Sequence, residues 1–103
     1  MNADKQLRLL KCLSDKMRLE ILLFLRDGER CVCEMVEKLG AEQSLVSHHL
    51  RGLRKCNLVK FRHEGRKKMY RLAGPSVLKL LTELEKSSKK LCRTAPNLAS
   101  ARP

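Results

Sequence analysis

Two cysteines separated by a single residue, Cys31 and Cys33, are the side chains of this sequence best suited to bind or react with a ligand. Soft thiolates favour soft, thiophilic ions, and the N-terminus of a helix, where we place this pair, stabilises a thiolate. Residues i and i+2 point about 200° apart on a regular helix. A ligand shared by both sulfurs therefore requires the first helical turn to unwind.

A thiol-based redox sensor is the alternative interpretation of the same residues. Cys31 and Cys33 could form a local disulfide, or either could pair with Cys12 or Cys92 under oxidants or reactive sulfur species. The fifth cysteine, Cys56, is interpreted as a small buried side chain. The odd number of cysteines and the lack of a visible secretory signal argue against a disulfide scaffold.

The charge of the chain predicts a nucleic acid as its partner. The 103 residues include 23 Lys plus Arg and 11 Asp plus Glu, for a formal net charge of +12, which is typical of a nucleic-acid-binding domain. Aromatic residues make up only 3%, too few to stack successive bases of a single strand, so duplex DNA is favoured. The longest apolar run, residues 21–25, is far shorter than the roughly 18 residues that span a bilayer. We therefore expect a soluble cytoplasmic protein with no membrane partner.

The sequence carries none of the common catalytic signatures. It has no glycine-rich phosphate loop, no His-Glu-x-x-His and no evident pair of carboxylates for acid–base work. Ser47, His48 and His49 are neighbours in sequence, but adjacent helical residues diverge by about 100° and cannot act on one substrate. We therefore expect a binding protein and not an enzyme.

Apolar periodicity and turn residues predict five helices and two strands in one domain over residues 1–93, followed by a flexible tail over residues 94–103. The helices are expected over residues 4–13, 15–27, 31–39, 42–55 and 74–91, and the strands over residues 58–62 and 67–72. The order α-α-α-α-β-β-α, with two short helices joined at a tight turn and then a hairpin, indicates a mainly α fold, a winged helix-turn-helix. One helix is then expected in the major groove, with the basic hairpin, or wing, against neighbouring phosphates.

Three motifs in the chain resemble those of the ArsR/SmtB repressor family. Residues 13–22 read LSDKMRLEIL, residues 43–50 read QSLVSHHL, and residues 58–72 contain LV, RHEGR and YRL in that order. The resemblance covers residues 4–91. It implies a homodimeric transcriptional repressor that releases operator DNA when it binds a metal, a metalloid or an oxidised sulfur species.

The resemblance also assigns roles to individual residues. DNA contacts are expected from the helix over residues 42–55 and from the wing, at Gln43, Ser44, Ser47, His48, Arg51, Arg62, Arg66, Lys67 and Lys68. His49 is interpreted as an inward packing residue. The apolar stripes of the first and last helices predict a dimer interface, which would place the two recognition helices about 34 Å apart. Its residues are Leu7, Leu10, Val77, Leu80, Leu81 and Leu84.

The segment Cys31-Val32-Cys33-Glu34-Met35 resembles the C-V-C-D-L motif of arsenite- and cadmium/lead-responsive members of that family. The arsenite version often has a third cysteine three residues after the second, and this chain has Val36 there. Cys12 or Cys92 is then the candidate third ligand, with an external thiol as another possibility. Arsenite or antimonite is favoured as the inducer, and cadmium or lead comes next.

Overall fold

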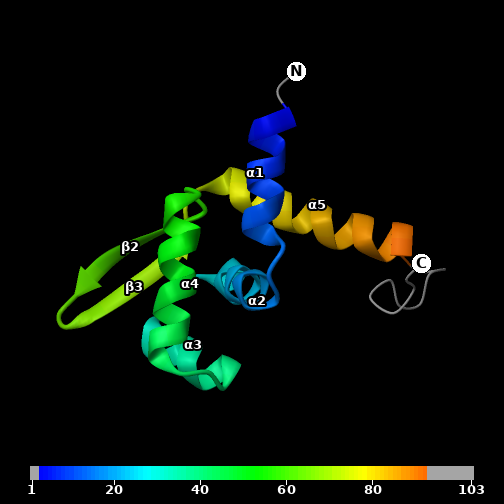
Figure 1. Ribbon diagram of the computed structural model, residues 1–103. Helices are drawn as coiled ribbons and strands as arrows, with labels where there is room; N and C mark the ends of the chain where they lie inside the picture. Colours follow the sequence, from blue (N-terminus) through cyan, green and yellow to red (C-terminus); the bar gives the residue numbers. More distant parts are fainter. Residues whose placement is uncertain (1–2, 93–103) are drawn as a thin grey trace.

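The computed structural model describes residues 3–92 and has the predicted mainly α fold with a β-hairpin wing (Figure 1). The predicted tail, residues 94–103, lies outside the described residues. Along the chain the elements are α1 (Ala3–Leu13), α2 (Lys16–Phe24), the 3₁₀-helix η1 (Leu25–Asp27), β1 (Arg30–Cys31), α3 (Val32–Leu39), α4 (Gln43–Lys55), β2 (Val59–Glu64), β3 (Lys67–Leu72) and α5 (Pro75–Cys92). In Figure 1 the wing extends to one side of α4, while α1 and α5 lie on the other side.

The sheet has a third strand that periodicity did not predict. β1 pairs with β3 on the side away from β2, antiparallel, with Arg30 opposite Tyr70 and Cys31 opposite Met69. A strand of two residues is too short to show the alternation by which strands are predicted. Because of this strand pairing, Cys31 has an extended backbone conformation and is not, as predicted, the first residue of a helix.

The wing is longer and its turn tighter than predicted. β2 runs to Glu64, two residues beyond the expected end, and only Gly65 and Arg66 separate it from β3. Gly65 has φ +62°, which a two-residue hairpin turn requires and glycine adopts without steric cost. The basic turn is therefore held by the strand pairing of Glu64 with Lys67.

Capping side chains and local backbone conformation set where the helices begin and end. Asp15 caps α2, since its carboxylate accepts a hydrogen bond of 3.0 Å from the backbone N–H of Arg18. α2 ends at Phe24, earlier than predicted, because the chain tightens into η1 before Gly28. Asn57, with φ +60°, follows α4 in the left-handed conformation that commonly ends a helix.

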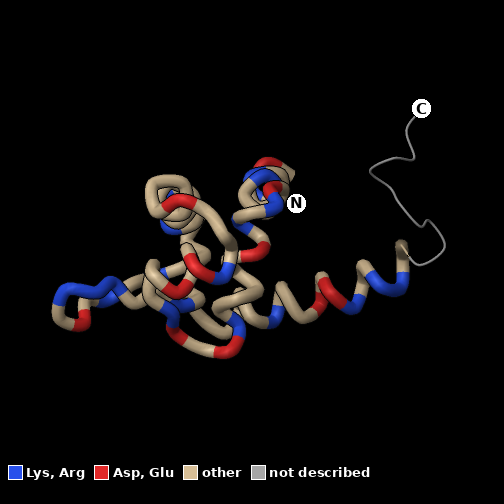
Figure 2. The backbone as a smooth tube through the Cα atoms, turned by 90° about the horizontal axis from the view of Figure 1, so that it is seen from below, with Lys and Arg blue, Asp and Glu red and all other residues tan. Residues whose placement is uncertain are grey.

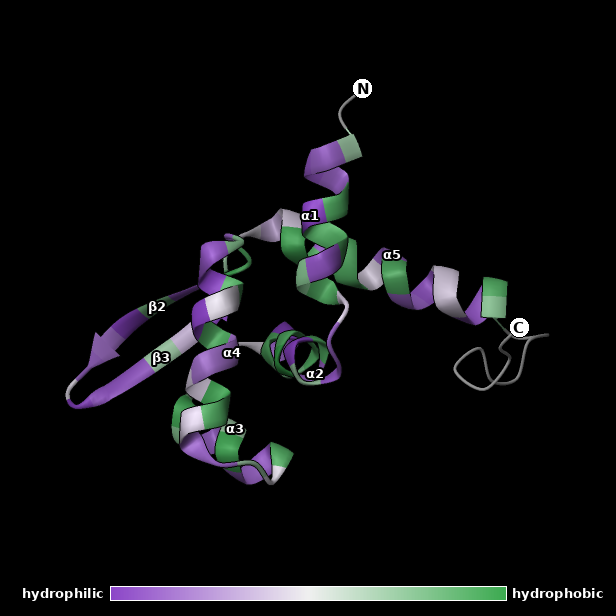
Figure 3. Ribbon diagram, in the orientation of Figure 1, coloured by the Kyte–Doolittle hydropathy of each residue, from purple (hydrophilic) through white to green (hydrophobic). Residues whose placement is uncertain are grey.

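One apolar core lies between α2, α3, α4, the sheet and the start of α5. The largest fully buried side chains are Ile21, Leu22, Met35, Val46, Leu50, Leu53 and Leu81. Leu45, although it belongs to the apolar pattern of α4, is 44% exposed on the helix's first turn. Figure 3 shows the resulting contrast between hydrophobic residues on α2 and hydrophilic ones along the wing.

The apolar stripe of α5 divides between two environments. Val77 and Leu81 are buried in the core of the single chain, so they have almost no surface left for a dimer interface, contrary to the sequence-based assignment. Leu80 is half-buried against the same core, whereas Leu84 is exposed. On α1, Leu7 and Leu10 are also exposed, and Leu78 of α5 joins them as an exposed leucine that the prediction missed. Among the described residues, no helix is long and apolar enough to cross a membrane.

Removing the cap of α2 is expected to destabilise the protein. We predict that Asp15→Ala lowers the free energy of unfolding by about 1 kcal/mol, whereas Asp15→Ser, which retains an oxygen acceptor, lowers it much less. The N–H of Arg18 lowers the pKa of Asp15, so the wild-type contribution is present at neutral pH and is lost as pH falls through that lowered value. Urea unfolding of the three proteins at neutral and acidic pH measures both effects. Equal stabilities of the Ala and Ser variants would contradict the cap.

Candidate DNA interface and thiol pair

A basic hollow of about 420 Å³ lies between α4, the wing and the start of α3. Most of the residues assigned to DNA binding or ligand binding from the sequence meet here. The lining residues are Cys31, Val32, Cys33, Gln43, Ser47, Arg51, Arg54, Arg66, Lys67, Lys68 and Tyr70. No carboxylate lines it, and Figure 2 shows Lys and Arg positions concentrated along the wing.

α4 supplies one wall of the basic hollow. Gln43, Ser47, Arg51 and Arg54 recur at helical spacing on one face, while the opposite face of α4 is buried in the core. Arg54 is absent from the sequence-based site, although its spacing from Arg51 already placed it on the same face. Two more predicted contact residues, Ser44 and His48, are exposed on α4 but do not line the hollow.

The first turn of α4 is open to an anion. Glu42, the N-cap residue, makes no side-chain hydrogen bond to the helix. The backbone N–H groups of Leu45 and Val46 bond to the Glu42 carbonyl, so those of Gln43 and Ser44 have no partner within the helix. Backbone N–H groups at the positive end of a helix are suited to binding a phosphate oxygen.

An aromatic ring holds two cations at the other wall. The guanidinium carbon of Arg54 and the Nζ atom of Lys68 lie 4.6 Å and 4.8 Å from the centre of the Phe61 ring. Phe61 in turn packs against Tyr70, its partner across the strands. These cation–π contacts fix positive charge between α4 and the wing, where a phosphate backbone would pass.

Arg62, which was predicted to contact DNA, is engaged elsewhere. Its guanidinium donates hydrogen bonds to Glu29, at 2.7 and 2.9 Å, and to Glu64, at 2.8 Å. These bonds lower the pKa of Glu29 and raise that of Arg62. Alternation along β2 places Arg62 on the face of the sheet opposite Phe61. The structure therefore removes Arg62 from the group of cations around the basic hollow.

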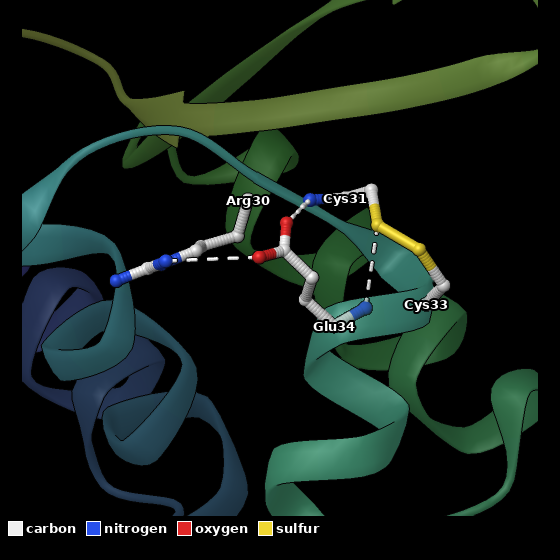
Figure 4. Close-up of a disulfide and its surroundings, with 4 residues drawn as sticks. All are labelled: Arg30, Cys31, Cys33 and Glu34. Carbon is white, nitrogen blue, oxygen red and sulfur yellow. Dashed lines mark hydrogen bonds and ion pairs between the residues drawn. A yellow bond between two sulfur atoms is a disulfide. The ribbon is translucent and has the colours of Figure 1, made fainter.

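Cys31 and Cys33 are joined by a disulfide, with their Cα atoms 5.3 Å apart (Figure 4). Cys31 is the N-cap of α3: its Sγ accepts a hydrogen bond of 3.3 Å from the N–H of Glu34, and the Glu34 carboxylate accepts one of 2.9 Å from the N–H of Cys31. Because Cys31 is extended and only Cys33 is helical, the two sulfurs meet with α3 intact. The prediction that the first turn must unwind is wrong for this reason.

A second disulfide joins Cys12 of α1 to Cys56 at the end of α4, with 6.7 Å between the Cα atoms. This pairing and the presence of two disulfides were not predicted, because the contact between α1 and the end of α4 exists only in the folded chain. Cys12 is therefore committed to Cys56 and not to the Cys31–Cys33 pair. Within residues 3–92, no group of three or more His, Cys, Asp or Glu side chains is placed to hold a metal ion.

His49 lies on the inner side of α4, as expected, and links it to the start of α2. Its Nδ1 atom is 3.8 Å from the carboxylate of Asp15, and only 14% of its side chain is exposed. One turn further along α4, the guanidinium of Arg18 lies so close to Gly52 that an added Cβ would sit 2.5 Å from Nη2. The start of α2 thus contacts the inner face of α4, and the outer face of α4 lines the basic hollow.

Comparison with known proteins agrees with this architecture. The family described as bacterial regulatory protein, arsR family, matches residues 15–60, from the cap of α2 into β2. A homodimeric winged helix-turn-helix DNA-binding domain from Mycobacterium bovis, described as a possible ArsR-family transcriptional regulator, superposes with a TM-score of 0.80 at 32% identity, covering 88% of this chain and 85% of that one. This chain belongs to the arsR family.

Two further proteins are similar to this chain. Reduced HlyU from Vibrio cholerae has a TM-score of 0.77 and 35% identity, covering 82% of this chain and 90% of that chain. The arsenical resistance operon repressor of Staphylococcus xylosus is 45% identical over 64 residues, which is 62% of this chain and 62% of that protein. The chain thus matches less than two thirds of the length of the arsenical repressor.

The ion pair that removes Arg62 from the basic hollow can be tested by titration. We expect NMR titration of the Glu29 carboxyl to give a pKa below the ordinary glutamate value, and Arg62→Gln to raise it, since the main hydrogen-bond donor is lost. Arg71→Gln is the matched control, because Arg71 acts on Glu29 only through its charge. A larger change with Arg71→Gln than with Arg62→Gln would contradict the assignment.

Proposed function

We propose that this chain is a transcriptional repressor that binds duplex operator DNA as a homodimer and releases it when a thiophilic ion binds Cys31 and Cys33. One observation carries the proposal: the thiol pair opens into the same basic hollow that the outer face of α4 and the wing create. The family membership and the net charge of +12 agree with DNA as the partner. A DNA-bound repressor would act in the cytoplasm.

In the proposed complex, α4 enters the major groove and the wing follows the phosphate backbone. Gln43, Ser44, Ser47 and His48 offer short polar groups at the exposed start of α4, where base edges are read. Phosphate contacts are assigned to Arg51, Arg54, Arg66, Lys67 and Lys68. Arg62 is left out because two carboxylates already hold its guanidinium.

The proposed dimer forms through α1 and α5. These helices lie on the side of α4 away from the wing (Figure 1), so pairing them leaves both hollows open. Leu7 is 50% and Leu10 is 59% exposed, and Leu78 and Leu84 add exposed apolar surface on α5. Burying apolar side chains of this size stabilises an interface by removing them from water.

Arsenite or antimonite is the favoured inducer, and cadmium or lead comes next. The two sulfurs are close enough for one ion to bridge them once the disulfide is reduced, and soft thiolates select such ions. Under the reducing conditions that free Cys31 and Cys33, Cys12 is also released from Cys56, so a third ligand would come from Cys12, Cys92 or an external thiol. The name of the Staphylococcus xylosus relative supports a metalloid.

Bound at Cys31, an ion would act on DNA binding in two ways. It would occupy part of the hollow proposed to hold the phosphate backbone. It would also engage the Cys31 sulfur, which in this structure accepts the capping hydrogen bond of α3. Cys31 is also paired with Met69 of β3, so a change at its backbone reaches the wing directly. The inducer would then disturb both DNA-contacting elements from one point.

Oxidation of the same pair is the second candidate trigger. The disulfide between Cys31 and Cys33 shows that the folded chain accommodates this state, and one solved relative is described as reduced HlyU. Release of DNA by a disulfide-forming oxidant, but not by arsenite, would select this trigger.

The DNA interface is tested by the salt dependence of binding. With fluorescence anisotropy of labelled duplex DNA, Arg51→Gln and Lys68→Gln are each expected to weaken binding and to reduce the slope of log K against log salt by about 0.9, because one phosphate contact is lost. Arg62→Gln is the matched control and is expected to leave the slope unchanged. A wild-type slope near zero would refute the interface.

The sensing site is tested with reduced protein bound to the duplex upstream of its own gene. Cys31→Ser and Cys33→Ser are expected to keep DNA binding and to lose release by arsenite, since one thiolate cannot hold the ion alone. Cys12→Ser and Cys92→Ser distinguish the source of the third ligand: unchanged release from both variants points to an external thiol. Full release from the Cys31→Ser/Cys33→Ser double variant would place sensing elsewhere.

A further inference from the structure

We propose that the basic hollow makes the Cys31–Cys33 dithiol selective for anionic disulfides, which oxidise it by thiol–disulfide exchange. The inference deepens the oxidation trigger and rests on the proposed function only in using the same thiol pair as the sensor. It assigns a ligand class: a small molecule with a disulfide bond and carboxylate or other acidic groups. Neutral and cationic disulfides of similar size are disfavoured.

The charge around the thiol pair carries the selectivity. Five cationic side chains line the hollow together with both cysteines, and no lining residue is acidic. These residues are Arg51, Arg54, Arg66, Lys67 and Lys68. A concave surface that carries one sign of charge raises the local concentration of the opposite ion and accelerates its encounter, about 10- to 1000-fold where the field is strong.

The carboxylate of Glu34, next to the thiol pair, is held by the backbone of Cys31 and the side chain of Arg30. Glu34 accepts a hydrogen bond from the N–H of Cys31 and forms an ion pair of 3.6 Å with Arg30 (Figure 4). It lies among the residues of α3 and does not line the hollow. Glu34 is thus engaged by Arg30 and by the N–H of Cys31, and the charged residues that line the hollow beside the sulfurs are all cations.

The exposure of the two cysteines sets the order of the reaction. Cys33 is exposed on the first turn of α3, whereas Cys31 is 4% exposed and its Sγ caps the helix. An incoming disulfide therefore reaches Cys33 first. Cys31 then resolves the mixed disulfide, because its sulfur is held within bonding distance of Cys33.

The exchange balances without any further reactant. The Cys33 thiolate attacks one sulfur of R–S–S–R, forming a Cys33–S–S–R bond and releasing R–S⁻. Cys31 gives up its proton to solvent, and its thiolate attacks the Cys33 sulfur, forming the Cys31–Cys33 bond and releasing a second R–S⁻. The two cysteines lose two electrons in total, and the ligand's disulfide is reduced to two thiolates.

The test uses the fully reduced chain, residues 1–103, without DNA. Oxidised glutathione is the anionic probe, bis(2-hydroxyethyl) disulfide the neutral one and cystamine the cationic one, and each rate is normalised to the same probe's rate with dithiothreitol. After quenching by alkylation, tryptic cleavage at Arg30 and Lys38 places Cys31 and Cys33 in one peptide, residues 31–38. Cys12 and Cys56 fall in two other peptides, so their disulfide is counted separately.

The expected result is a normalised rate at Cys31–Cys33 that is at least about tenfold higher for oxidised glutathione than for the neutral probe, and lowest for cystamine, at low ionic strength. The preference should shrink as salt rises. Arg51→Gln and Lys68→Gln should each reduce it, whereas Arg62→Gln, an exposed cation held by Glu29, should leave it unchanged.

Equal normalised rates for the three probes would overturn the proposal, as would a preference that persists in the Arg51→Gln/Lys68→Gln double variant. Because no DNA is present, this failure is distinguishable from failure of the proposed repressor function, which is measured by anisotropy with reduced protein. Near- and far-ultraviolet circular dichroism of each variant shows that it is folded, so loss of the preference cannot be assigned to unfolding.

Discussion

The antiparallel pairing of Arg30 and Cys31 with β3 is the contact on which the candidate site depends. It holds Cys31 in extended backbone at the point where α3 begins, so one residue is a strand residue, a helix cap and a wall of the basic hollow. If Cys31 were helical, its sulfur would point about 200° from that of Cys33. The short strand therefore determines that the two sulfurs meet, and that they meet between α4 and the wing.

The rest of the structure holds that arrangement in place from both sides. Behind α4, the core and the contacts of Asp15 and Arg18 with His49 and Gly52 fix the helix against α2. In front, Phe61 holds the cations of Arg54 and Lys68 over its ring. A reaction at the thiol pair and the binding of a polyanion would thus take place in the same hollow, next to the same cations. Their coupling needs no long path through the protein.

Three ion pairs with glutamates show why a count of charges is insufficient. The net charge of +12 predicts a polyanionic partner, but it does not say which cations are available to that partner. Glu29 and Glu64 neutralise Arg62, and Glu85 forms an ion pair of 2.6 Å with Arg26. Five other cations, Arg51, Arg54, Arg66, Lys67 and Lys68, line the basic hollow between α4 and the wing.

The sequence alone determined the family, the order of the helices, the wing and most of the polar face of α4. These follow from local patterns, namely the apolar spacing within each helix and the turn residues between elements. Tertiary structure alone decided that Val77 and Leu81 belong to the core, that Cys12 pairs with Cys56, and that Arg62 is held by Glu29. It also placed Cys31 in a strand. Each of these depends on contacts between residues far apart in the chain, which no local pattern encodes.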